Sequence, residues 1–275
     1  HFIQHECMVP FINSTHILIG PFLYRNRIVF VGFTSLKFFT KEQRIIRNTH
    51  MKRIGNTFRI ILNTTISLVS LLFSQDGKLV PIKLELPKPM FIGTPQNLNV
   101  KNLQKPLGKP RPAFLAPEGT ENVALEKMVY SSDDFPVIGE IEMITDDDKN
   151  ATEGSFVELG PFLQDVTIDL GANYKMYAIV FWHFHKQARV YFDVVVQTAD
   201  DKDMTENVTT LFNNDIDNSA GFGVGKDMHY VETSEGKLID AKGVTGRYVK
   251  LYSKGNTNND LNHYIEVAVY GLPVK

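Results

Sequence analysis

Apolar and polar positions alternate along most of the chain after residue 122, and short alternating runs are typical of half-buried β-strands. The clearest run lies near the C-terminus, where Ile265, Val267 and Val269 share one face. Turn residues separate the runs, and no long helical period appears. The predicted strands span residues 124–130, 156–159, 165–170, 176–183, 191–198, 208–212, 229–233, 247–252 and 265–270. This spacing of short strands predicts an all-β fold, an antiparallel sandwich or barrel.

The first 74 residues show a different pattern. Residues 1–50 have no sustained period, and we interpret them as an upstream extension before a start at Met51. Basic residues, an apolar stretch over 58–73 and small residues then follow, which predicts a signal peptide over 51–74 and a secreted product. The apolar stretch is short for a membrane span and contains Asn63, so no integral span is expected in the mature chain.

Residues 75–121 contain eight prolines, which break helices and do not fit central strands. This composition predicts an extended, polyproline-like connector. A poorly ordered tail would have the same composition, and the sequence leaves both interpretations open. The folded domain is therefore predicted to cover residues 122–275.

Charge and cysteine content narrow the functional classes. The 275 residues include 29 basic and 31 acidic side chains, so no nucleic-acid-binding surface is indicated. Cys7 is the single cysteine, so an intramolecular disulfide is excluded. A secreted domain of this kind must gain its stability from packing or from a metal ion.

One acidic turn is a candidate metal site. Residues 144–154 include three consecutive acids, which repel one another unless solvent or a cation relieves the charge. Hard cations such as Ca²⁺ bind oxygen ligands in loops of this kind. Glu266 lies among apolar residues in the last strand, where a buried carboxylate needs a cation or donors. A solvated turn is the alternative, and Glu266 favours calcium.

Several of these strands carry the motifs of a known family. The runs RYVKLY at 247–252 and IEVAVYG at 265–271 resemble the closing strands of discoidin (coagulation factor 5/8 type C) domains. NVALEK at 122–127 and VTIDLG at 166–171 resemble that family's opening and central strand. The resemblance implies a galactose-binding-like jelly-roll sandwich, similar to family 32-type carbohydrate-binding modules. It also implies a non-catalytic module with a structural Ca²⁺, and its matching positions are Ile144, Asp146, Asp148, Thr152 and Glu266.

The resemblance further implies a glycan site on loops at one end of the sandwich. The polar loop 211–225 and the stretch 182–189 supply the side-chain types that sugars require, namely planar donors and acceptors beside aromatic rings. The candidate ligand-binding residues are Trp182, His183, His185, Gln187, Arg189, Asn213, Asn214, Asp217, His229 and Tyr230. An adhesion module that binds a cell-surface protein is the alternative within the same fold.

A metalloenzyme is the third hypothesis. His183 and His185 are two residues apart, and on a strand they would share a face, as in a two-histidine metal site. This spacing suggests a cupin-like enzyme, in which His229 would be a third ligand. The acid that a cupin places shortly after the histidines is missing, so a neutral, hydrogen-bonded pair is the favoured interpretation.

Overall fold

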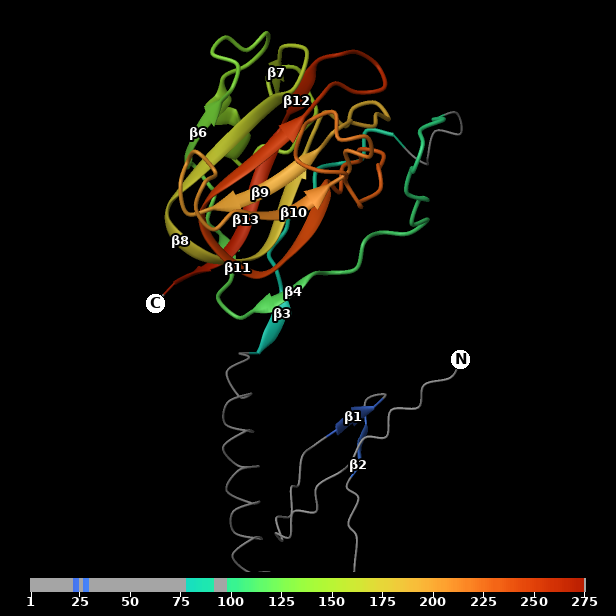
Figure 1. Ribbon diagram of the computed structural model, residues 1–275. Coiled ribbons are helices and arrows are strands. Elements are labelled where there is room, and N and C mark those ends of the chain that lie inside the picture. Colours follow the sequence, from blue (N-terminus) through green and yellow to red (C-terminus); the bar gives the residue numbers. More distant parts are fainter. Residues whose placement is uncertain (1–21, 25–26, 30–77, 92–97, 275) are drawn as a thin grey trace, which may run out of the picture. The chain divides into compact units, whose positions relative to one another are not determined.

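The computed structural model describes residues 22–24, 27–29, 78–91 and 98–274 (Figure 1). The chain divides into two compact units, residues 1–71 and 72–275. In the first unit, β1 (Phe22–Tyr24) and β2 (Arg27–Val29) form an antiparallel pair. The predicted signal peptide and most of the predicted extension lie outside the described residues. All site residues predicted from the sequence belong to the second unit.

The described residues of the second unit form mainly antiparallel strands and one 3₁₀ helix, η1 (Ile141–Thr145). Its strands are β3 (Leu79–Pro81), β4 (Leu115–Pro117), β5 (Glu121–Asn122), β6 (Met128–Ser131), β7 (Val157–Leu159), β8 (Gln164–Trp182), β9 (Val195–Ala199), β10 (Thr209–Asn213), β11 (Lys237–Ser253), β12 (Asn262–Tyr264) and β13 (Glu266–Pro273). The main sheet has the order β10-β9-β11-β8-β13-β5, and β6 also pairs with β8. The predicted all-β class is confirmed.

The two long strands β8 and β11 join the two halves of the sheet (Figure 1). One half contains β6 and β9, and the other contains β13. Residues 166–169 of β8 pair with β6, while residues 248–252 of β11 pair with β9. Residues 174–182 of β8 instead pair with β13 on one side and with residues 237–246 of β11 on the other. Gly171 at φ +82° and Gly243 at φ +76° lie where the register shifts, because glycine adopts this backbone conformation without steric cost.

Side chains from both halves meet in one interior. Ile168 and Leu170 from the first half of β8 join Ile179 and Phe181 from its second half in a single apolar cluster. The curved sheet thus encloses its own core as a β-sandwich, and burial of this cluster is the main source of stability.

A second apolar cluster lies on the opposite face of β8 and β13. Val180, Trp182 and Ala268 form its centre, and Ile82 and Phe114 pack against it. The Tyr270 hydroxyl also donates a hydrogen bond to the Lys83 carbonyl at 3.0 Å. Residues 82–84 and Phe114 of the proline-rich region therefore pack on the sandwich and cover this apolar cluster.

Several predicted strand boundaries are wrong. The runs 165–170 and 176–183 form the single strand β8, and the strand predicted at 191–198 begins only at Val195. The strand predicted at 229–233 is absent from the described residues, where His229 makes just an isolated bridge to Leu103. The first half of β11, residues 237–246, was not predicted, because its glycines and charges are typical of turns. No helix in the described ranges is long and apolar enough to cross a membrane.

Candidate ligand-binding site

Most of the predicted ligand-binding side chains are buried rather than open to a sugar. Among the ten, Gln187 and Asp217 are exposed. The other eight, all classed as buried, are Trp182, His183, His185, Arg189, Asn213, Asn214, His229 and Tyr230. The structure therefore does not assemble the ten into one open apex.

The buried amides and rings of this set mostly organise loops. Asn214 accepts a hydrogen bond from the Val194 amide at 2.7 Å, and the Asn213 side chain donates to the Gly223 carbonyl at 3.0 Å. The Trp182 indole donates to the Ser234 carbonyl at 3.0 Å. A Cβ atom on Gly236 would lie 2.5 Å from the Trp182 ring, so the chain needs glycine there. These contacts fix the loop that precedes β11.

The two histidines of the predicted metal pair have separate partners. His183 contacts a Glu232 carboxylate oxygen through Nδ1 at 2.7 Å, and both side chains are fully buried. His185 donates from Nε2 to the Lys149 carbonyl at 2.9 Å. Both residues follow the end of β8, so strand geometry does not hold them on one face. This arrangement agrees with the favoured interpretation of hydrogen-bonded histidines and differs from the cupin-like alternative.

Around His183 lies a buried polar network. The Tyr191 ring stacks on His183 with centroids 4.2 Å apart, and its hydroxyl contacts His263 Nδ1 at 2.9 Å. His263 Nε2 in turn contacts a Glu158 carboxylate oxygen at 2.8 Å. Burial, with Arg189 and His183 close by, lowers the pKa of His263 to about 3. The ring is therefore neutral, accepts from Tyr191 and donates to Glu158.

A segment of the proline-rich region packs along the loop that contains Glu232. The Gln104 amide donates to the His229 carbonyl at 2.7 Å, and His229 Nδ1 donates to the Lys101 carbonyl at 3.1 Å. Burial lowers the pKa of His229, which keeps this ring neutral. We call residues 98–114 the strap. It was predicted as a connector, and nothing in its sequence indicated contact with residues 227–236.

Arg111 fastens the far end of the strap. Its guanidinium donates to the carbonyls of Gly236 at 2.9 Å and of Glu235 at 2.8 Å. Its backbone amide lies 3.2 Å from each carboxylate oxygen of Glu235. Burial lowers the pKa of Arg111, and the nearby Glu235 charge partly offsets that effect. The strap and the loop before β11 thus form one continuous surface.

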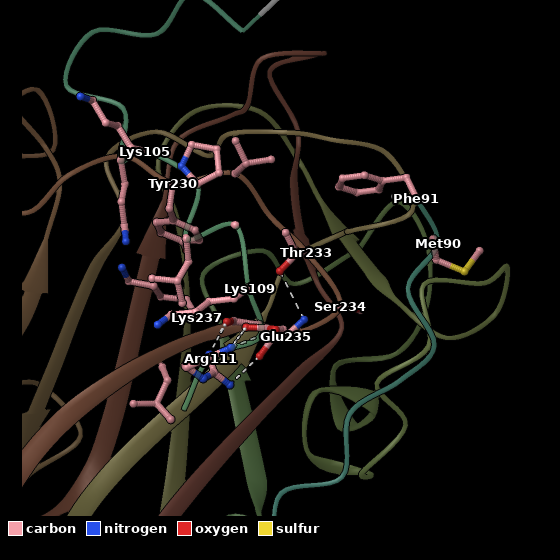
Figure 2. A pocket seen from close by; sticks show the side chains of 17 residues that line it. Met90, Phe91, Lys105, Lys109, Arg111, Tyr230, Thr233, Ser234, Glu235 and Lys237 are labelled. Atoms are coloured by element: carbon pink, nitrogen blue, oxygen red, sulfur yellow. Dashed lines mark hydrogen bonds between the residues drawn. The ribbon is translucent and has the colours of Figure 1, made fainter. Parts of the chain in front are cut away.

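Between the strap and this loop is a hollow of about 490 Å³ (Figure 2). Its lining combines apolar surface with polar groups, a mixture typical of ligand sites. Basic side chains lie on the side opposite Met90 and Phe91 in Figure 2. The lining includes the side chains of Phe91, Lys105, Lys109, Arg111, Tyr230, Thr233, Glu235 and Lys237. Tyr230 is the one predicted ligand residue in this lining, so sequence reasoning missed nearly the whole hollow.

The predicted metal residues are brought together only in part. Glu266 is fully buried, and one of its oxygens accepts from the Asp147 amide at 3.0 Å. The other oxygen is buried without a hydrogen-bond partner among the described residues. Burial raises the pKa of Glu266 to about 8, which means that the site disfavours an uncompensated negative charge. Glu266 therefore fits a cation ligand.

The rest of the acidic turn fits less well. Asp148 accepts from the Asn150 side chain at 2.6 Å, and the Thr152 hydroxyl lies 3.0 Å from that of Ser155. Asp146 Oδ1 accepts from the Asp148 amide at 2.8 Å. Lys149 is buried, and its ammonium group contacts the Asp147 carboxylate. Lys149 therefore offers a second way to balance charge near Glu266.

A different acidic group forms between the loop after β10 and the segment before β9. Within the described ranges, Asp193, Asp215 and Asp217 are the one set of three potential metal ligands that lie close together. Asp215 accepts from the amides of Ser219 at 3.0 Å and Ala220 at 2.9 Å. Through these hydrogen bonds Asp215 stabilises the turn at residues 215–220, which gives this carboxylate a structural role.

Comparison with known proteins gives structural similarities alone. No protein-family model matches the chain, and no curated protein matches it. A family 32 carbohydrate-binding module of AlyQ, solved with 4,5-unsaturated mannuronic acid, is 16% identical with a TM-score of 0.38. That match covers 52% of this chain and 92% of the module. Carbohydrate-binding modules are the class that the sequence resemblance indicated.

Two further structures show the same kind of likeness. A fucose-binding module from Streptococcus pneumoniae is 17% identical with a TM-score of 0.38, over 54% of this chain and 96% of the module. A family 89 glycoside hydrolase from Clostridium perfringens is 18% identical with a TM-score of 0.41. In that case the match covers 56% of this chain and just 15% of the hydrolase. With TM-scores below 0.5, function must be argued from this chain's own residues.

Proposed function

We propose that the protein is a secreted, non-catalytic module that binds carbohydrate in the hollow between the strap and the loop before β11. The observation that carries this proposal is the hollow's lining on a rigid β scaffold. Phe91 supplies an aromatic ring for the C–H face of a sugar, and Thr233 supplies a hydroxyl group. The glycan partner that the sequence resemblance implies is consistent with this lining.

A glycan array probed with the full chain tests the proposal. We expect binding to a restricted set of saccharides, and we expect Phe91→Ala to weaken it about tenfold, because loss of one aromatic contact costs about 1–1.5 kcal/mol. Phe162→Ala is the matched control, since Phe162 is 78% exposed and lies outside the hollow's lining. Absence of saccharide binding, or equal affinity of Phe91→Ala and wild type, would overturn the proposal.

We also propose a structural Ca²⁺ at the acidic turn, held by Glu266 and Asp146 with Ile144, Asp148 and Thr152 as the further predicted ligands. The unpartnered buried oxygen of Glu266 supports it. Bound Ca²⁺ would supply the positive charge that this carboxylate needs and would tie the turn to β13. Metal analysis should find about one calcium per chain, and chelation should lower the melting temperature, because a ligand of the native state stabilises it.

Glu266→Gln is the matched variant, since it keeps the shape and removes the charge. We expect it to abolish calcium uptake and the effect of chelation. The metal proposal would be contradicted if the protein contained no calcium and EDTA did not change its melting temperature. Lys149 would then be the group that balances the charge of Glu266.

A further inference from the structure

The ammonium group of Lys237, a lining residue of the hollow, lies against aromatic rings rather than carboxylates. Lys237 is the first residue of β11, directly after Gly236, and its ammonium group lies 4.6 Å from the ring centres of both Phe212 and Tyr230. Among the described residues, it has neither a hydrogen-bond partner nor a carboxylate within 4.0 Å. Aromatic faces stabilise such a cation but leave its three donors unused.

Burial lowers the pKa of Lys237, and the more distant carboxylates of Asp227 and Glu232 oppose this effect. The amine therefore gains from an anion that reaches it, because an opposite charge restores its protonated form. Lys237 is one of the residues that line the hollow, so a ligand there lies beside its side chain.

Three of the four other charged residues that line the hollow are basic. Lys105 and Lys109 of the strap lie in the lining, both are exposed, and neither forms an ion pair within the described ranges. Glu235 is the one acidic residue of the lining, and its carboxylate faces the Arg111 amide. Four basic side chains around one carboxylate give the hollow a positive potential, although the chain's formal net charge is −2.

We propose that the hollow is an anion-selective saccharide site, in which Lys237 binds a carboxylate or sulfate group of an acidic sugar. Lys105 and Lys109 add attraction from the strap, and Phe91 contacts the sugar ring. The inference rests on the proposed function, because it assumes that a saccharide occupies this hollow. It adds the class of saccharide and the residue that selects it.

Calorimetric titration of the full chain with three tetrasaccharides tests the inference. The probes are a galacturonic acid oligomer, a sulfated galactose oligomer and a neutral galactose oligomer. We expect one or both acidic oligomers to bind more tightly than the neutral one, with affinity that falls as salt rises. Preference for one acidic oligomer identifies the group as carboxylate or sulfate.

Lys237→Met is the decisive variant, because it keeps the apolar stem against the two rings and removes the charge. It should weaken the acidic oligomers about 10- to 100-fold, as expected for loss of a hydrogen bond to a charged group, and leave neutral binding unchanged. Lys186→Met, an exposed lysine outside the lining, is the control and should bind as wild type.

Two outcomes would overturn the inference. If acidic and neutral oligomers bind equally, or if Lys237→Met binds the acidic ones as well as wild type does, the site is not anion-selective while the proposed function stands. If none of the oligomers binds and the glycan array is also empty, both proposals fail. A melting curve for each variant shows that the protein titrated is folded.

Discussion

Two polar regions lie near each other in this domain and serve different ends. In the buried network, His183 faces Glu232, and His263 bridges Tyr191 and Glu158. In the hollow, the amine of Lys237 lies against two aromatic rings and has no carboxylate within 4.0 Å among the residues that the structure describes. In the first region these side chains bind one another and help to specify the fold, although His183 Nε2 and one Glu232 carboxylate oxygen have no hydrogen-bond partner among the described residues. The second leaves charge unmatched beside open space, so it is the place where an external ligand can gain binding energy.

Residue type alone was a poor guide to the ligand site, because most of the predicted ligand residues are buried. Histidine, tryptophan and asparagine are typical of sugar sites, but here they bind their own protein. The lysines of the strap look like ordinary linker residues until the fold places them beside β11.

The largest expected effect comes from the buried pair. Glu232→Ala should reduce the free energy of unfolding by about 3–5 kcal/mol, because it leaves His183 buried without its partner. Chemical denaturation measures this loss. Glu206→Ala, at an exposed position, should change stability by no more than about 0.5 kcal/mol. Similar losses for the two variants would break the distinction between the buried network and the surface.

Next in size is a substitution at the boundary of the two regions. Gly236→Ala should cost about 2–4 kcal/mol, since Gly236 has φ +63° and a Cβ there meets the Trp182 ring. Gly154→Ala is the control, because Gly154 has φ +87° with open space around its Cβ position. Its smaller loss, measured by the same denaturation, isolates the strain of the backbone. Equal losses would mean that contact with Trp182 contributes nothing.

A pH effect of intermediate size should arise from His263. Its folded pKa of about 3 lies below the unfolded value of about 6.5, so the unfolded chain binds the proton more strongly. Stability is therefore full above pH 6.5 and declines as pH falls towards 3, by about 2 kcal/mol between pH 6.5 and 5. Denaturation at several pH values should show this slope. His263→Gln should flatten it, and an unchanged slope would assign the acid sensitivity elsewhere.

The smallest effect concerns the strap. Arg111→Lys cannot reproduce both guanidinium hydrogen bonds to the carbonyls of Glu235 and Gly236, so it should cost about 1 kcal/mol locally. Hydrogen exchange at the Gln104 amide should accelerate about fivefold, with little change at the core strands. Acceleration throughout the domain would show that the strap and the sandwich open as one unit.

The sequence predicted the class of fold well because alternation survives in every strand that has one buried face. It failed at the first half of β11, where Asp240, Lys242 and Gly243 form the bend that carries the strand from one half of the sheet to the other. It also failed at residues 229–233, a loop in which His229, Tyr230 and Glu232 are buried without forming a strand. Residue type misled the prediction there, because aromatic and β-branched residues are also buried in loops.

The site was harder to predict because it depends on long-range contact. Arg111 and Glu235 are 124 residues apart in sequence, and no local pattern links them. The proximity of Glu266 to the acidic turn was implied by the family resemblance, and its apolar neighbours in the sequence indicated that this carboxylate needs a cation or donors. Lysines in a proline-rich segment carry no comparable signal, since exposed lysines need no partner.

The shared strands also determine how the domain can assemble. β8 pairs with β11 from Gln164↔Ser253 to Phe181↔Lys237, which joins segments far apart in the chain. Neither half of the sheet can form without these two strands, so no half is an independent folding unit. Closing the long intervening chain comes before most stabilising contacts, and such topologies fold slowly. The domain should therefore fold slowly and cooperatively, with few native contacts formed before the rate-limiting step.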